Sequence, residues 1–118
     1  MDIQQKLGAD IIMQLDQCPP YPATREFVQR AVDLSANWAR RCLAAHKRED
    51  QALFAICQGG MHLDLRLDSI ARLKQIGRES VASGHKDFVS IIDRGERYAV
   101  VVKLARVQGR RSGIHPNR

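Results

Sequence analysis

The sequence lacks several features that would assign it to a specialised class of protein. No apolar run approaches the roughly 18 residues that a membrane-spanning helix needs, and the first residues, MDIQQKLGAD, lack the basic and then apolar layout of a signal peptide. Aromatic residues make up 5% of the chain. With 44% apolar and 27% charged residues among 118, the composition is that of a soluble globular segment about one domain long. We therefore expect a cytoplasmic protein with no membrane partner.

Cysteine and histidine are too sparse to predict a disulfide framework or a metal site. Cys18, Cys42 and Cys57 form an odd set separated by 24 and 15 positions, which matches neither a bridged scaffold nor the close pairs of a zinc site. We expect reduced, mostly buried thiols. We expect no metal ligand among the four histidines, which are His46 near a predicted helix end, His62 within a predicted helix, and His85 and His115 in the C-terminal part.

Positive charge is concentrated in the last third of the chain. The whole sequence has 19 basic and 13 acidic residues, for a net charge of +6. Residues 1–84 carry 11 basic and 10 acidic side chains, whereas residues 85–118 carry 8 and 3. A basic tail of this kind suits an anionic partner such as nucleic acid, and solvated basic tails without a partner are at least as common.

In the first half of the chain, a strand pattern is followed by a helix pattern. Residues 9–16, ADIIMQLD, form a short apolar run, and the prolines of the following CPPYP cannot continue a strand or a helix. Residues 24–47 space their apolar side chains by three and four positions, which predicts an amphipathic helix capped by Thr24. Its predicted apolar face comprises Phe27, Ala31, Leu34, Trp38, Cys42 and Ala45.

The same order of patterns then repeats. Residues 52–58, ALFAICQ, predict a buried strand that stops at Gly59 and Gly60. Residues 61–76 alternate like a strand at first, but helical spacing holds over the longer window and predicts a second helix. Its predicted apolar face comprises Leu63, Leu67, Ile70, Leu73 and Ile76. Two apolar strands, each followed by a helix, indicate parallel βα units and an α/β fold.

The character of the sequence shifts after Gly77. Residues 88–92 and 98–104 are rich in β-formers on either side of DRGE, which predicts a β-hairpin. We expect this hairpin not to supply a further parallel strand. The remaining VQGRRSGIHPNR is basic and is expected to be frayed or disordered.

Polar side chains close both predicted strands of the first half. Asp16 ends the first apolar run and Gln58 ends the second. In parallel α/β folds the carboxyl ends of strands face the ligand site, so a carboxylate and a carboxamide here can read the edge of a purine. Alternatively, Asp16 caps the following loop and Gln58 satisfies backbone groups of the glycine turn. The residue pattern leaves both interpretations open.

Two stretches of sequence carry a family resemblance. LGADIIMQLDQCPPYPAT, and then WARRCLAAHKREDQALFAICQGGMHLDLR, resemble the central part of tRNA-guanine transglycosylases, also called queuine tRNA-ribosyltransferases. The resemblance runs without gaps from about residue 3 to residue 77 and rests on the uncommon strings DQCPPYPAT and FAICQGG. It implies a zinc-containing (β/α)8 barrel that exchanges the wobble guanine of certain tRNAs for queuine or a 7-deazaguanine precursor through a covalent aspartyl intermediate.

The resemblance assigns roles to four residues. Asp16 matches the aspartate that contacts the exchanged base, and Cys18 matches the cysteine beside that base. Gln58 matches the glutamine that binds the carbonyl edge of the purine, with Gly59 forming the turn behind it. Gln17 stands where many members of the family have glutamate.

Other parts of the family pattern are missing. The family's nucleophile lies in a motif close to DMFDCVLPTR and its zinc ligands in a CxCxxC string, and neither string occurs here, so we expect no catalytic residue and no zinc ligand in this chain. A GYAIGGL-like stretch is replaced by RESVASGHK, with His85 at the second glycine. We therefore predict a barrel segment at 1–77, and a divergent basic tail at 78–118 that is not the family's native continuation but arises from a frameshift, a recombination junction or a faulty gene model.

Two classes of function follow from these observations. The first is a base-exchange transferase acting on tRNA and a 7-deazaguanine-type base, homodimeric when complete and present here as a partial (β/α)8 barrel of about two βα units. The second is a non-catalytic module that binds RNA or a protein partner through the basic tail.

Overall fold

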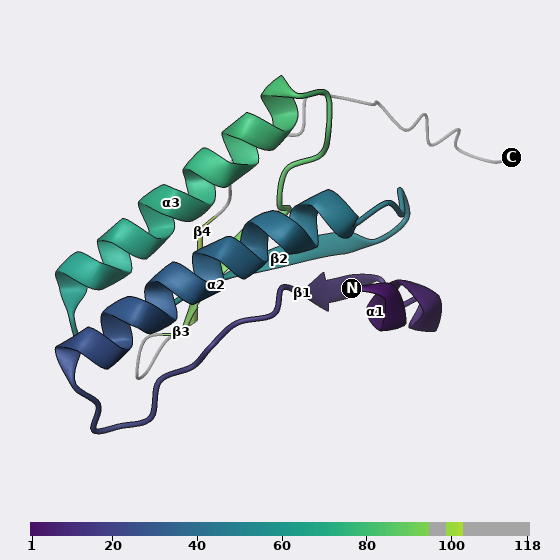
Figure 1. Ribbon diagram of the computed structural model, residues 1–118. Coiled ribbons are helices and arrows are strands. Elements are labelled where there is room, and N and C mark those ends of the chain that lie inside the picture. The colour runs from purple at the N-terminus through teal and green to yellow at the C-terminus, as the bar shows by residue number, and fades with distance from the viewer. Residues whose placement is uncertain (95–98, 103–118) are drawn as a thin grey trace, which may run out of the picture.

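The computed structural model describes residues 1–94 and 99–102, which form a sheet with helices packed on one face (Figure 1). In chain order the elements are α1 (Asp2–Leu7), β1 (Ile11–Met13), α2 (Arg25–Ala45), β2 (Ala52–Cys57), α3 (Leu63–Ala82), β3 (Ser90–Arg94) and β4 (Ala99–Val102). The strands lie in the order β1-β2-β3-β4. The two long helices α2 and α3 pack against each other and against β2 (Figure 1). The predicted α/β class is therefore confirmed.

The first two strands pair in parallel, as the sequence predicts. Ile12 lies opposite Leu53 in the ladder between β1 and β2. The first strand is shorter than the predicted run 9–16, because regular pairing ends at Met13 and the side chain of Leu15 is 60% exposed. One further backbone bond, from the N–H of Gln14 to the carbonyl of Phe54 at 3.0 Å, carries the chain past the end of β1.

The third strand corrects the prediction for residues beyond 77. We expected residues 88–104 to form a hairpin that cannot supply a parallel strand, but β3 pairs in parallel with β2 and buries Ile91 completely. The hairpin itself is present, because β3 and β4 pair in antiparallel fashion. Asp93 and Arg94 of the predicted turn DRGE belong to β3. The rest of that turn, and the predicted frayed or disordered end at 107–118, fall outside the described residues.

The long helices begin close to the predicted positions. Thr24 precedes α2, and its hydroxyl accepts a hydrogen bond from the N–H of Phe27 at 3.2 Å, which confirms the predicted cap. His62 lies at the N-cap of α3, one residue before the helix, so its predicted place within the helix is wrong. The second helix also continues past residue 76 to Ala82. The predicted boundary at Gly77 therefore falls inside a helix.

The buried faces of both helices overlap the predicted ones only in part. In α2, Leu34 and Trp38 are only partly buried and Ala45 is exposed, while in α3 Leu63 and Leu67 are exposed. Ala31 and Cys42 of α2, and Leu73 and Ile76 of α3, are buried as predicted. In α2, small side chains let the helix approach the sheet closely. The buried residues are Val28, Ala31, Val32, Ser35, Ala36, Ala39, Cys42 and Leu43 in α2, and Leu65, Ser69, Leu73, Ile76 and Gly77 in α3.

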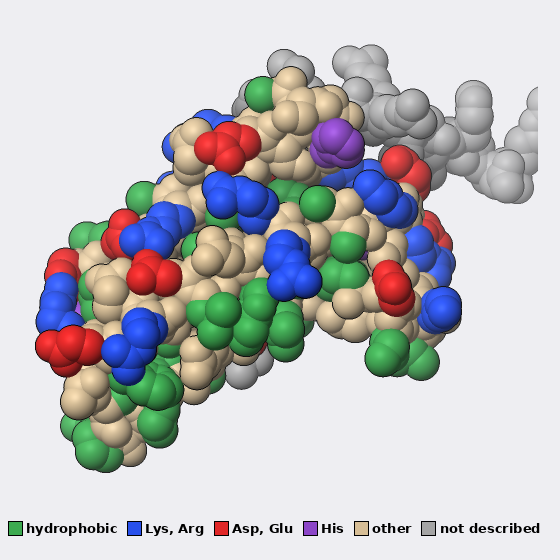
Figure 2. Space-filling model, viewed as in Figure 1, with side chains coloured by type: hydrophobic (Ala, Val, Ile, Leu, Met, Phe, Trp, Pro, Cys, Tyr) green, Lys and Arg blue, Asp and Glu red, His purple; other side chains and the backbone are tan. Residues whose placement is uncertain are grey.

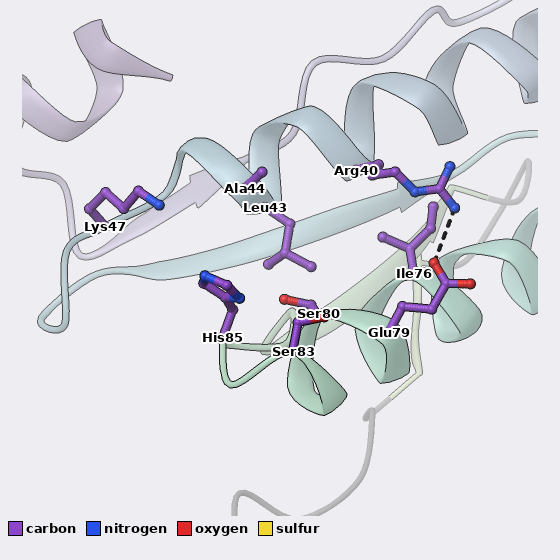
Figure 3. A pocket seen from close by; sticks show the side chains of 9 residues that line it. All are labelled: Arg40, Leu43, Ala44, Lys47, Ile76, Glu79, Ser80, Ser83 and His85. Carbon is purple, nitrogen blue, oxygen red and sulfur yellow. Dashed lines mark hydrogen bonds and ion pairs between the residues drawn. The ribbon is translucent and has the colours of Figure 1, made fainter.

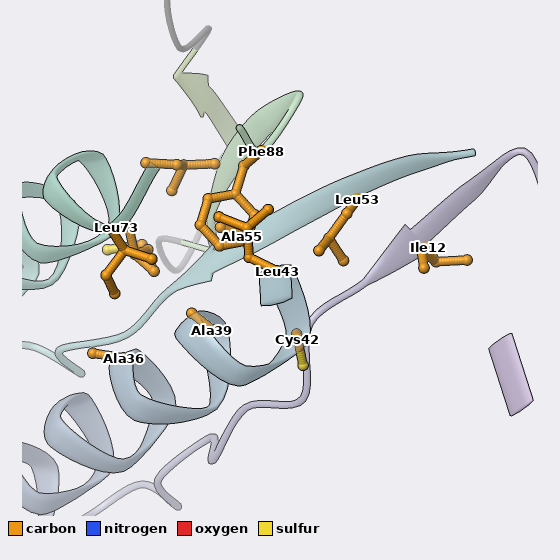
Figure 4. Close-up of a cluster of buried hydrophobic side chains, with 12 residues drawn as sticks. Ile12, Ala36, Ala39, Cys42, Leu43, Leu53, Ala55, Leu73 and Phe88 are labelled. Carbon is orange, nitrogen blue, oxygen red and sulfur yellow. The ribbon is translucent and has the colours of Figure 1, made fainter. Parts of the chain in front are cut away.

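A single main core joins the sheet to both helices (Figure 4). Leu53 and Ala55 project from β2 toward Ala39 and Leu43 of α2, and Leu73 of α3 completes the layer. Leu53 and Leu73 are each 1% exposed. The core therefore fixes how the ends of β1 and β2 lie relative to the two helices.

The short N-terminal helix α1 is absent from the sequence-based prediction. It ends at Gly8, which adopts the left-handed conformation with φ of 73°. The side chain of Gln4 donates to the carbonyl of Met13 at 2.9 Å, and this bond ties α1 to β1. Six residues with few apolar side chains give too weak a periodic signal to be recognised in the sequence.

The outer face of the helix layer carries charges of both signs (Figure 2). Ion pairs join the helices there, from Arg72 to Asp33 at 2.6 Å and from Arg40 to Glu79 at 3.3 Å. This mixture agrees with the near balance of charge over residues 1–84. No helix within residues 1–94 and 99–102 combines the length and apolarity needed to span a membrane.

Candidate functional site

The structure brings the two predicted strand-end side chains together. The side-chain amide of Gln58 donates a hydrogen bond to Oδ2 of Asp16, 42 positions away in sequence. Gln58 is buried, at 8% exposure, and Asp16 is partly buried. The predicted convergence of these residues at one edge of the sheet is a feature of the structure, because parallel strands end on the same side.

Gln58 follows directly after β2, and a hydrogen bond of its backbone N–H holds it in place. Its N–H donates to the hydroxyl of Ser69 in α3 at 3.0 Å. Ser69 is 4% exposed, so this bond lies in the interior. A buried polar side chain that also has a fixed backbone loses little further conformational entropy on binding a ligand.

Asp16 lies in the segment between β1 and α2, and a second buried serine fixes that segment. The N–H of Gln17, the next residue, donates to the hydroxyl of Ser35 in α2 at 2.9 Å. Ser35 is 2% exposed. Each candidate residue thus has a helix serine bonded to its own backbone or to that of its neighbour.

Gln14 links Ser35 of α2 to strand β2. Its side-chain carbonyl accepts from the N–H of Ile56 at 3.0 Å, and its amide donates to the carbonyl of Ser35 at 2.9 Å. Gln14 is 3% exposed. The sequence-based reasoning missed Gln14, Ser35 and Ser69, although a polar residue inside an apolar run and serines at helical spacing were visible signals.

The glycines after Gln58 permit a close approach to α3. Gly59 has a φ of +139°, and a Cβ atom there would lie 2.5 Å from the backbone nitrogen of Arg66. Arg66 also donates from Nη1 to the carbonyl of Gly60 at 2.7 Å. Glycine is required at position 59 by both its conformation and its packing, and the turn it forms holds Gln58 against the start of α3.

A hollow of about 420 Å³ opens beside this turn. Gln58, Cys57 and Cys18 lie in its wall, whereas Asp16 and Gly59 are not among the lining residues. Cys42 and Cys57 are buried and Cys18 is exposed, which agrees with the prediction of reduced, mostly buried thiols. The remaining lining residues are Pro19, Pro20, Tyr21, Pro22, Ala23, Val28, Gly60, Met61, His62 and Arg66.

A second hollow, of about 370 Å³, lies between the C-terminal halves of α2 and α3 (Figure 3). The ion pair between Arg40 and Glu79 crosses it, and Lys47 and His85 lie at its margin (Figure 3). It contains no strand-end residue. Because ligands of parallel α/β folds bind at the carboxyl ends of strands, the hollow beside Gln58 is the better candidate.

An exposed ion pair joins the starts of the two helices near the candidate hollow. Arg25 of α2 pairs with Asp64 of α3, and the hydrogen bond from Arg25 holds the pKa of the Asp64 carboxyl below its ordinary value. Exposed pairs contribute little to stability, so we expect this one to add little to the packing of the two helices.

The described residues offer no metal centre. Within residues 1–94 and 99–102, no group of three or more His, Cys, Asp or Glu side chains is placed to hold a metal ion. His62 and Cys18 line the same hollow, but they do not make up such a group. These side chains therefore do not fit the zinc that the family resemblance implies.

The family model and the curated relatives that match this chain carry the same description. The family model described as queuine tRNA-ribosyltransferase matches residues 1–106. The queuine tRNA-ribosyltransferase of Halothermothrix orenii is 52% identical over 84 residues, which cover 71% of this chain and 22% of that protein. The corresponding protein of Nostoc sp. is 44% identical over 103 residues, covering 87% and 27%, and that of Pseudomonas aeruginosa is 48% identical over 84 residues, covering 71% and 23%.

The chain spans about a quarter of the length of the curated relatives it matches. The matched range also continues past residue 77, to residue 106. Similarity to these proteins thus extends into the segment that we predicted to be foreign to them, which speaks against a break at residue 78. The domain boundary itself stays a prediction.

Proposed function

Because the chain belongs to the queuine tRNA-ribosyltransferase family, we propose that it carries the base-reading part of a tRNA-guanine transglycosylase site. The complete enzyme would exchange the wobble guanine of tRNA for queuine or a 7-deazaguanine precursor. The observation that supports this proposal is the contact between Gln58 and Asp16 at the carboxyl ends of two parallel strands.

The chemistry of the pair suits a guanine-type base. An ionised carboxylate at Asp16 accepts from the ring N–H and the exocyclic amine of the base, while the Gln58 amide donates to its carbonyl oxygen. The Gln58 amide donates to the Asp16 carboxylate, so the two groups lie side by side. Cys18 and Gly59 flank this edge, Cys18 in the wall of the hollow and Gly59 in the turn behind Gln58.

The arrangement of strands and helices supports the proposal that this chain is part of a (β/α)8 barrel. Three parallel strands with α2 and α3 packed on one face have the arrangement of consecutive barrel units. In this proposal the nucleophile and the zinc ligands are supplied by residues outside those described, and the complete enzyme is a cytoplasmic homodimer. The tRNA partner follows from the family.

Base binding by purified chain 1–118 tests the proposal. Equilibrium dialysis with radiolabelled 7-deazaguanine is compared for the unmodified chain, Asp16→Asn and Gln58→Ala. We expect Asp16→Asn to weaken binding by roughly one to two orders of magnitude, since an amide cannot accept from two donors as a carboxylate does. Gln58→Ala should weaken it less.

Asp33→Asn provides the matched control. It makes the same chemical change on the outer face of α2, where Asp33 pairs with Arg72, and should leave base binding unchanged. Equal affinity of all four chains, or no binding by the unmodified chain, would contradict the proposal that this segment reads the base.

A further inference from the structure

Two buried serines stand out because their neighbours on the same helix faces are apolar. Ser35 lies four residues from both Ala31 and Ala39, which are fully buried in α2. Ser69 likewise lies four residues from Leu65 and Leu73, at 4% and 1% exposure in α3. Packing alone would be served by alanine at both positions, so the hydroxyls need another explanation.

The explanation lies at the ends of the strands. Regular pairing stops at Met13 in β1 and at Cys57 in β2. The N–H groups of Gln17 and Gln58 lie beyond those ends, outside the regular strand ladders, and they donate instead to Ser35 and Ser69. A buried N–H without an acceptor is unfavourable, so each hydroxyl holds its segment in one place.

We propose that Ser35 and Ser69 are positioning residues that set the relative placement of Asp16 and Gln58. Ser69 acts on Gln58 directly, through its backbone N–H, and Ser35 acts on Asp16 through the adjacent Gln17. Gln14 ties the Ser35 anchor to β2, because it bonds both to the carbonyl of Ser35 and to the N–H of Ile56, two residues before Gln58. The consequence for a bound base rests on the proposed function, but the placement of the pair does not.

The test uses chain 1–118 and the variants Ser35→Ala and Ser69→Ala. The first measurement is the chemical shift of the two side-chain Nε2 protons of Gln58 by NMR, because one proton is bonded to Asp16 and the other is not. The second is the affinity for 7-deazaguanine. Ser80→Ala is the matched control, since Ser80 also lies in α3 and also forms a side-chain hydrogen bond, to the carbonyl of Lys86.

In both serine variants we expect the two Nε2 proton shifts of Gln58 to converge and base affinity to fall roughly tenfold, the effect of leaving one buried donor unpaired. Ser80→Ala should change neither quantity. Ser35→Thr and Ser69→Thr retain the hydroxyl and should keep the Gln58 proton shifts and the base affinity of the unmodified chain. If Ser69→Ala does not fold, Ser69→Cys, with its weaker acceptor, should give an intermediate convergence.

The outcomes separate this inference from the proposed function. Unchanged Gln58 shifts in both alanine variants, or equal changes in Ser80→Ala, would overturn the positioning role whatever the base affinity. Converging shifts without any base binding by the unmodified chain would uphold the positioning role and refute the proposed function. Converging shifts with unaltered base affinity would uphold the positioning role and refute its expected consequence for base binding.

Discussion

Gln58 and Asp16 come from different βα units and meet through a side-chain hydrogen bond at the edge of the sheet. Neither residue contributes to a strand as the structure defines it, because each lies just beyond the last paired position of β1 or β2. Their meeting depends on the parallel register of the two strands. The candidate site is thus a direct result of the topology.

We predict that the chain alone does not exchange guanine in tRNA. By family resemblance the nucleophile belongs to a motif that this sequence lacks, and binding groups without a nucleophile leave most of the barrier in place. Incubation of purified chain with cognate tRNA and radiolabelled guanine should give no more incorporation than tRNA alone. A relative of full length serves as the positive control, and incorporation by the chain above background would refute the prediction.

Gly59→Ala should destabilise the chain and disturb the base-reading edge. The substitution forces a β-carbon to within 2.5 Å of the Arg66 nitrogen at a φ of +139°, and conformational strain of this kind costs about 1–3 kcal/mol. Chemical denaturation monitored by circular dichroism measures the loss. Gly84→Ala is the control, because Gly84 has a φ of +79° but its new methyl group would meet no other part of the described chain within 4 Å. A loss no greater than in Gly84→Ala would show that the approach of Arg66 is unimportant.

Gly77→Ala should also destabilise the chain, against the usual trend inside helices. Alanine is favoured over glycine in a helix by about 1 kcal/mol, but here the new methyl group would lie 1.9 Å from Oδ1 of Asp87. Overpacking of this kind costs about 1–3 kcal/mol. In an Asp87→Ala background the same substitution should instead stabilise, because the clash is gone. The same sign in both backgrounds, measured by denaturant titration, would disprove the explanation.

His46 should make the chain less stable in mildly acidic solution. Its pKa is lowered from the ordinary 6.5, first by burial and then by the charge of Lys86, while the nearby side chain of Gln51 acts in the opposite direction. The folded chain therefore binds this proton less readily than the unfolded chain. The contribution of neutral His46 is complete above the ordinary pKa and declines as the pH falls through and below it.

Lys86→Met isolates the charge effect on His46. Removal of the positive charge should raise the pKa of His46 toward its ordinary value, without restoring it fully, because burial remains the larger cause. NMR titration of the imidazole ring measures this pKa, and thermal unfolding between about pH 5 and 8 should show a weaker dependence on pH. Lys74→Met is the control, because it removes the same charge from another lysine, within α3. An equal shift in both variants would exclude a specific effect of Lys86.

The parallel order of the first two strands and the placement of Asp16 and Gln58 could be predicted, because apolar runs closed by polar residues are a local signal. The buried face of α2 could not. Phe27, Leu34 and Trp38 keep helical spacing, yet a neighbouring stripe of smaller side chains packs on the sheet. Periodicity fixes the helix but not its rotation when two stripes of apolar residues lie side by side.

The anchoring serines and the third parallel strand were beyond local reasoning for a different reason. Ser35 and Ser69 are explained by backbone donors 18 and 11 positions away, and such pairings appear only once the chain is folded. In β3, Ser90 and Ile91 read equally well as a hairpin strand or a parallel strand, because the sequence of a short β-run does not specify the direction of its neighbour.

Within the described residues, β1 pairs with β2 only, so the other edge of β1 has no partner strand. Ile11 is 57% exposed on this strand, and Ile3 and Leu15, close to it in sequence, are 75% and 60% exposed. An unpaired edge with apolar side chains beside it is prone to association. We therefore expect the apparent molar mass of chain 1–118 from light scattering to rise with protein concentration, and its affinity and stability should be measured in dilute solution.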